Sequence, residues 1–91
     1  MVLVQLFAYF SEIAGKKEFE IDAENVDELL GNLIVACDKL TALIYESYES
    51  RVLNSDVMIL VNGRNMKALS GIRTGLKKDD VISIFPPICG G

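Results

Sequence analysis

Residues 2–9 have the pattern of a β-strand, with one wholly apolar face and a second face that is not properly polar. Its two faces are Val2, Val4, Leu6 and Ala8 on one side and Leu3, Gln5, Phe7 and Tyr9 on the other. Residues 10–14 predict a short turn of helix closed by Gly15, and residues 17–22 alternate again. The first 22 residues therefore predict a β-hairpin with a long connection.

A helical repeat of apolar residues follows over residues 26–40. Asn25 precedes it as a favourable N-cap, and Glu28 stands three residues later, as in a capping box. The apolar stripe is Val26, Leu29, Leu30, Leu33, Ile34, Cys37 and Leu40. Gly31 interrupts the helix, and we interpret it as the mark of a close backbone contact. Cys37 is expected to be a small core residue.

The second half of the chain predicts three further strands and less regular segments. We expect a helical turn followed by a loop over residues 41–54, and strands over residues 57–61, 64–66 and 81–85. Asn62-Gly63 favours a type I′ turn between the first two of these strands. Residues 68–76 predict a loop or 3₁₀ turn, residues 77–80 a charged turn, and Pro86 ends the last strand.

The resulting order, β-β-α-β-β-β, predicts an α+β fold in two layers, with one main helix packed on one face of a mixed sheet. A ubiquitin-like β-grasp is the commonest small fold with this order, although ferredoxin-like variants share it. We expect one domain over residues 1–85 and a flexible C-terminal Gly-Gly tail over residues 86–91. Pro86 and Pro87 would project this tail away from the body.

The net charge of −4 and the acidic pI of about 4.6 argue against binding to nucleic acid or to an anionic membrane. The chain has no apolar run of the roughly 20 residues that a bilayer requires, and we expect no signal peptide. Cys37 and Cys89 are then expected to be free thiols in a reducing cytoplasm.

Catalytic chemistry within the chain is not expected. The sequence contains no histidine and no glycine-rich phosphate loop, and Asp79-Asp80 lies beside Lys77-Lys78 in what we interpret as a solvated turn. We therefore expect no metal site, no bound cofactor and no ATP site. The reaction would belong to partner proteins.

Two features indicate how partners would use this chain. Gly90 and Gly91 leave a bare backbone that ends in a carboxylate and fits a narrow active site, although a frayed terminus has the same appearance. Phe7 and Phe85 would lie together on the uncovered face of the sheet, beside the root of the tail, and so mark a protein contact. The alternative is that residues 41–54 fold over them.

The residues that carry these features resemble the small sulfur-carrier subunit of molybdopterin synthase, in the family of ubiquitin-like sulfur carriers and archaeal modifiers. Residues 7–15 read F-A-Y-F-S-E-I-A-G, like the family's F-A-x-x-R-E-x-x-G, with Ser11 in place of the usual arginine. Residues 61–65 read V-N-G-R-N, and residues 84–91 read I-F-P-P-I-C-G-G, like the family's F-F-P-P-V-x-G-G. Cys89 stands where threonine, alanine or serine is commoner.

The resemblance implies that an E1-like partner adenylates the Gly91 carboxylate with ATP, and that a desulfurase or rhodanese-like sulfur donor converts it to a thiocarboxylate. The large subunit of molybdopterin synthase would receive the tail, so that this chain serves as the small subunit of a heteromeric enzyme. Gly90 and Cys89 would fit the tail channel, and Phe7, Phe85, Pro86 and Pro87 would dock the partners. Whether Cys89 takes part in the chemistry is left open.

Other outcomes of the same activation remain open. The adenylated Gly91 is also the starting point of a ubiquitin-like modifier that forms isopeptide bonds with lysines. It equally suits a sulfur carrier for thiamin synthesis or tRNA thiolation. A β-grasp binding module with an incidental Gly-Gly end is the remaining alternative.

Overall fold

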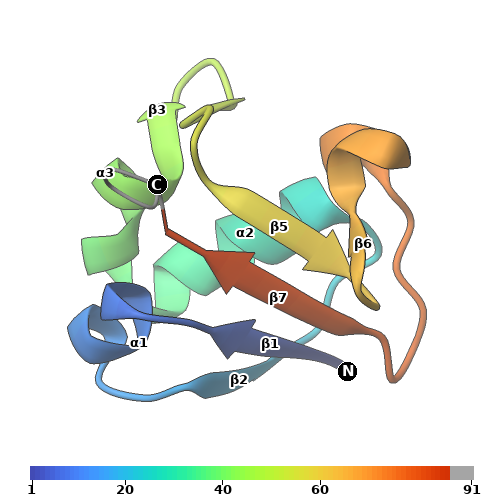
Figure 1. Ribbon diagram of the computed structural model, residues 1–91, viewed down its shortest axis with the longest axis horizontal. Helices are drawn as coiled ribbons and strands as arrows, with labels where there is room; N and C mark the ends of the chain where they lie inside the picture. Colours follow the sequence, from blue (N-terminus) through green and yellow to red (C-terminus); the bar gives the residue numbers. More distant parts are fainter. Residues whose placement is uncertain (87–91) are drawn as a thin grey trace.

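The computed structural model describes residues 1–86 and contains one five-stranded mixed sheet with α2 packed behind it (Figure 1). The strands are β1 (Val2–Leu6), β2 (Glu18–Ile21), β5 (Met58–Val61), β6 (Arg64–Asn65) and β7 (Val81–Phe85), in the order β2-β1-β7-β5-β6. A separate small hairpin consists of β3 (Tyr45–Ser47) and β4 (Val52–Leu53). The helices are α1 (Tyr9–Ala14), α2 (Val26–Ala36) and α3 (Thr41–Ile44), with 3₁₀ turns at Asp38–Leu40, Met66–Ala68 and Gly71–Arg73.

Strand pairing decides between the two folds that the predicted order allows. β1 and β7 are parallel neighbours at the centre of the sheet, whereas β2 pairs with β1 and β5 pairs with β7 in the antiparallel sense. The first and last strands therefore lie side by side, as in a ubiquitin-like β-grasp. The α+β prediction, with a mixed sheet and one main helix on one of its faces, is confirmed.

The core lies between the inner face of the sheet and α2. β1 and β7 each alternate between buried and half-buried residues, because successive side chains of a strand point to opposite faces. Fully buried residues from the strands and helices meet there: Val4, Phe10, Val26, Leu29, Leu30, Leu33, Leu40, Ile44, Ile82 and Ile84. One apolar core thus holds both layers together.

The main helix begins where the sequence predicts and ends earlier. Asn25 Oδ1 accepts a hydrogen bond from the Glu28 backbone N–H at 2.8 Å, while Glu28 Oε1 accepts from the N–H of Glu24 rather than from that of Asn25. α2 stops at Ala36 because Cys37 is extended, with φ −148°. The prediction of a helix to residue 40 is wrong, although Leu40 is still buried and Cys37 packs against the core half-buried.

Three other local predictions have mixed outcomes. Asn62 and Gly63 both have positive φ, at 51° and 84°, as a type I′ turn requires. The first strand ends at Leu6, not at residue 9, because the chain turns at Ala8. The segment 41–54 begins with the expected helical turn, α3, but the predicted loop contains the β3–β4 hairpin.

Gly31 faces the turn of this hairpin. A Cβ at Gly31 would lie 3.6 Å from Arg51 Nη1, so the contact that the sequence predicts at this glycine involves a guanidinium and not a second backbone. Arg51 also lies 4.6 Å over the ring of Tyr48, and its Nε is 4.0 Å from Asp27 Oδ1. We call Asp27, Tyr48 and Arg51 the Arg51 clasp, because they fasten the hairpin to α2.

Candidate functional site

Phe7 and Phe85 stack on the sheet face that α2 leaves uncovered. Their ring centroids are 4.3 Å apart and the rings are inclined by only 10°. This pairing follows from the register, since Leu6 is aligned with Ile84 in the parallel pair and the next residues become neighbours. The Phe7 N–H donates to the Ile84 carbonyl at 3.1 Å. The prediction that both aromatics share this face is confirmed.

The same face continues onto β5. Met58 is opposite Phe85 and Leu60 is opposite Ser83, which places both apolar side chains beside the aromatic pair. Phe7 and Met58 keep 36% and 38% of their surfaces exposed. The alternative in which residues 41–54 cover the aromatics is therefore wrong for Phe7. We call Phe7, Phe85, Met58 and Leu60 the apolar platform.

A strained turn follows the platform directly. Ala8 has φ 53° and ψ −137°, a conformation that glycine adopts readily and that is costly for a residue with a Cβ. Its carbonyl accepts hydrogen bonds from the Ser11 backbone N–H at 3.1 Å and the Ser11 hydroxyl at 2.8 Å. These bonds hold the turn that carries the chain from Phe7 into α1.

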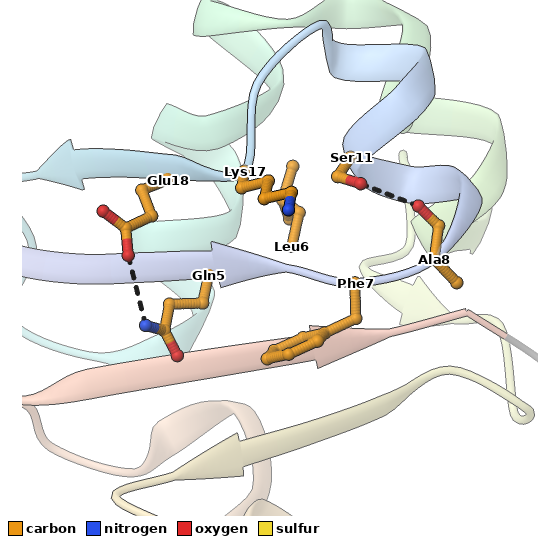
Figure 2. Close-up of a pocket in the computed structure, with 7 residues that line it drawn as sticks. All are labelled: Gln5, Leu6, Phe7, Ala8, Ser11, Lys17 and Glu18. Atoms are coloured by element: carbon orange, nitrogen blue, oxygen red, sulfur yellow. Dashed lines mark hydrogen bonds between the residues drawn. The ribbon is translucent and has the colours of Figure 1, made fainter.

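Because of this turn, Tyr9 does not extend the outer face of β1 as the alternation predicts. It lies in α1, is 38% exposed, and packs edge-on against Phe10 with centroids 5.4 Å apart. A hollow of about 250 Å³ opens beside Phe7, between β1, the turn and the start of β2 (Figure 2). Its lining includes Ser11 and Lys17, and Gln5 Nε2 donates to Glu18 Oε2 at 3.3 Å on its rim.

The root of the tail adjoins the platform. β7 ends at Phe85, as predicted, and Pro86 follows it as a buried residue outside the strand. The predicted tail residues Pro87, Cys89, Gly90 and Gly91 lie outside the described residues. The strand that carries one half of the aromatic stack thus leads directly into the C-terminal segment.

The charged turn at residues 77–80 has a structural role. Asp80 accepts hydrogen bonds from the Asn62 side-chain amide at 3.0 Å and from the Lys77 backbone N–H at 2.7 Å. These bonds, the Asn62 bond first, lower the pKa of the Asp80 carboxyl below its ordinary value. Asp79 is exposed with φ 72°. The carboxylate pair therefore lies in a turn, as predicted, and Asp80 closes it.

Residues 1–86 offer neither a cluster of metal ligands nor a membrane-spanning helix. Within this range, histidine, cysteine and acidic side chains do not gather in groups of three that would suit a metal ion. Over the same range, each helix is too short or too polar to cross a bilayer.

The model of the ThiS family matches residues 4–91. The chain belongs to the ThiS family. This result agrees with the predicted resemblance, and it covers the platform, the strained turn and the C-terminal segment together. The chain is thus a small ubiquitin-like protein of the sulfur-carrier and modifier group.

The relatives of this ThiS-family chain include proteins named as archaeal modifiers and one named as a molybdopterin converting factor. Small archaeal modifier protein 3 of Haloferax volcanii is 33% identical, over 97% of this chain and 96% of its own length. The solution structure of small archaeal modifier protein 1 from Methanosarcina acetivorans is 36% identical with a TM-score of 0.90, covering 99% of this chain and 95% of that one. A proposed molybdopterin converting factor, subunit 1, from Pyrococcus furiosus is 32% identical with a TM-score of 0.74, covering 96% and 97%.

Reasoning from the sequence missed Met58 and Leu60. Residues 57–61 are all apolar, so alternation does not show which of them face outward. Only the antiparallel pairing of β5 with β7 assigns them, because it sets Met58 beside Phe85. The β-grasp fold itself could have indicated them, because this strand lies next to the last strand of the sheet and shares its outward face.

Proposed function

We propose that this chain is a sulfur carrier whose C-terminal Gly91 is adenylated and then converted to a thiocarboxylate for molybdopterin synthesis. The observation that supports it best is the position of the stacked Phe7–Phe85 pair, where the platform meets the root of the Gly-Gly tail. A partner that binds the platform contacts the end of β7, the strand from which the tail continues. The six residues 86–91 span roughly 20 Å when extended, which is enough to enter a neighbouring active site.

The chemistry needs an activating partner, because a carboxylate is a poor electrophile. An E1-like enzyme joins the Gly91 carboxylate to the α-phosphate of ATP and releases pyrophosphate, so ATP is used by the partner and not held by this chain. Hydrosulfide then attacks the acyl carbon and expels AMP, leaving a thiocarboxylate and a proton. A donor persulfide reaches the same product when a thiol afterwards reduces the S–S bond. The resulting sulfur is a nucleophile at the end of a slender arm.

Each predicted site residue has a separate part in this proposal. Phe7 and Phe85 form the docking contact, Pro86 and Pro87 set the direction of the tail, and Gly91 supplies the reacting carboxyl. Gly90 and Cys89 would line up in the channel of the large synthase subunit, where a side chain at Gly90 would narrow the fit.

The test uses the full chain and the variant that lacks Gly91. The native chain should support ATP–pyrophosphate exchange with its activating enzyme, and the deletion should abolish the exchange while its thermal unfolding stays unchanged. A deletion variant that unfolds at a much lower temperature would contradict the separation of body and tail. Exchange that persists without Gly91 would refute activation at this residue.

A second function is favoured by the names of two relatives, the archaeal modifier proteins at 33% and 36% identity. In that role a lysine amine of a target protein, and not sulfur, displaces AMP or the thiol that carries the activated chain. Both functions share the platform and Gly91 and differ only in the acceptor. Conjugates that appear on denaturing gels with the native chain, and not with the Gly91 deletion, would support the modifier.

A further inference from the structure

A second candidate surface lies on the helical side of the molecule, across the sheet from the apolar platform (Figure 1). Val35, near the end of α2, is 84% exposed, and Tyr48 in the β3–β4 turn is 42% exposed. Single exposed apolar residues are ordinary on protein surfaces. Here they coincide with hollows, unsatisfied polar atoms and an excess of carboxylates.

Two hollows flank Tyr48. The first, of about 390 Å³, lies between α2 and the hairpin turn and is bordered by Asp27, Glu28, Val35 and Arg51. The second, of about 560 Å³, lies beside α3 and is bordered by Asp38, Lys39, Tyr45 and Glu46. Tyr48 lines both hollows, so it forms the ridge between them. We call this region the helical-side surface.

Contacts within the chain fix the position of Tyr48, the residue that forms the ridge. The Arg51 guanidinium covers one side of the Tyr48 ring at 4.6 Å, and the Tyr45 ring meets it edge-on with centroids 5.2 Å apart. The backbone N–H of Arg51 also donates to the Tyr48 carbonyl at 3.1 Å, and this bond closes the turn. A rigid surface loses less conformational entropy on binding than a mobile one.

Two buried polar atoms of this surface, Asp27 Oδ1 and the Tyr45 hydroxyl, lie beside the Arg51 guanidinium without a well-formed hydrogen bond within residues 1–86. Tyr45 is only 4% exposed, and burial raises the pKa of its hydroxyl, while the nearby Arg51 guanidinium opposes that rise. Buried polar atoms normally have partners. Because Asp27 Oδ1 is covered and faces Arg51, a basic partner is expected to reach the exposed carboxylates beside it, Glu28 and Asp38.

The charge of the surface favours a cationic donor. Asp27, Glu28, Asp38 and Glu46 border the two hollows, against Lys39 and Arg51. One of these two cations, Arg51, is already engaged by Asp27 and Tyr48. The surface therefore presents uncompensated negative charge around an exposed valine, in a chain of net charge −4.

We propose that the helical-side surface binds a basic protein segment, whose lysine or arginine side chains pair with the exposed carboxylates of Glu28 and Asp38 and whose aliphatic part covers Val35. The apolar platform lies on the opposite face, so this segment and a platform partner can be bound at the same time. The proposal is independent of which reaction Gly91 undergoes.

The test titrates isotope-labelled full chain with a short synthetic peptide of alternating lysine, arginine and leucine. Amide shifts are expected at residues 27–35 and 45–51, and none at Met58, Leu60 or Ser83. The same peptide with glutamate in place of its basic residues should cause no shifts. Shifts confined to the platform face, or no shifts with the basic peptide, would overturn the proposal.

A matched pair of charge reversals separates this site from general attraction. Asp38→Lys should weaken peptide binding roughly tenfold, because it sets a cation beside the bound segment. Glu20→Lys makes a similar change in charge on β2, away from the surface, and should alter the affinity less than about twofold. Equal losses in the two variants would show nonspecific attraction and refute the site.

A third variant tests the apolar part of the contact. Val35→Ser should lower affinity roughly fivefold, since it removes the exposed apolar side chain that the segment covers. Because Val35 is 84% exposed, thermal unfolding should not change. An unchanged affinity in this variant would contradict the contact at Val35.

Discussion

The open face of the sheet and the helical-side surface are positioned in different ways. On the sheet face, Phe7, Phe85 and Met58 are aligned by the backbone register of β1, β7 and β5. On the helical side, Tyr48 is held by side chains, chiefly by Arg51 between α2 and the hairpin turn. Strand register places a whole row of residues at once, whereas a side-chain clasp depends on each of its members. We therefore expect single substitutions to affect the two surfaces differently.

The largest effect is expected at the centre of the platform. Phe85→Glu should weaken binding of the activating enzyme by about 2–4 kcal/mol, because a carboxylate replaces one ring of an exposed aromatic stack. Titration calorimetry with the purified enzyme measures this loss. The matched control is Val35→Glu, the same charge on the opposite side, which should leave that affinity unchanged. Similar losses in both variants would show that the platform is not the docking face.

Two substitutions test the Arg51 clasp, at Gly31 and at Arg51, which face each other. Gly31→Ala should stabilise the fold by about 0.5–1 kcal/mol through helix propensity, because the new Cβ would meet Arg51 Nη1 at an ordinary 3.6 Å. Arg51→Ala should instead increase hydrogen exchange at the Asn54 N–H, which donates to the Ile44 carbonyl beside the hairpin, without unfolding the sheet. Denaturant unfolding and amide exchange measure the two effects. A destabilised Gly31→Ala variant would show that the guanidinium needs a bare backbone there.

These two regions also differ in how far the sequence predicts them. Alternation in residues 2–7 and 81–85 assigns Phe7 and Phe85 to one face, and their adjacency then follows from a parallel pairing of the first and last strands. The β3–β4 hairpin gives no such signal, because its strands are three and two residues long and their register shifts between Tyr45 and Ser47. Its position depends on Arg51, whose φ of 55° and contact with α2 appear only in three dimensions.

A smaller effect is expected at the strained turn after Phe7. Ala8→Gly should stabilise the fold by about 0.5 kcal/mol, because relief of the positive φ outweighs the added entropy of the unfolded chain. Ala14→Gly, at the last residue of α1, makes the same chemical change without strain to relieve and should destabilise by about 0.5–1 kcal/mol. Denaturant unfolding of both variants gives the comparison. If both are destabilised equally, the turn at Ala8 is not strained.

The smallest effect concerns pH. The lowered pKa of Asp80 means that its ionised form stabilises the fold; this contribution is complete above the ordinary value of 3.8 and is lost as pH falls through the lower folded value. Asp80→Asn should therefore lower the melting temperature slightly at neutral pH, and the difference from the native chain should shrink in acid. Melting curves at a series of pH values measure it. A difference that stays constant into acid would exclude an ionised Asp80 as its cause.

The central claim, that the chain carries sulfur on Gly91, is tested most directly by the intact mass of the protein purified from its native host. The account predicts a species heavier by the replacement of one oxygen by sulfur, with the change located in the C-terminal peptide that contains Gly91. A chain found only in unmodified form, with no conjugates to other proteins, would contradict it.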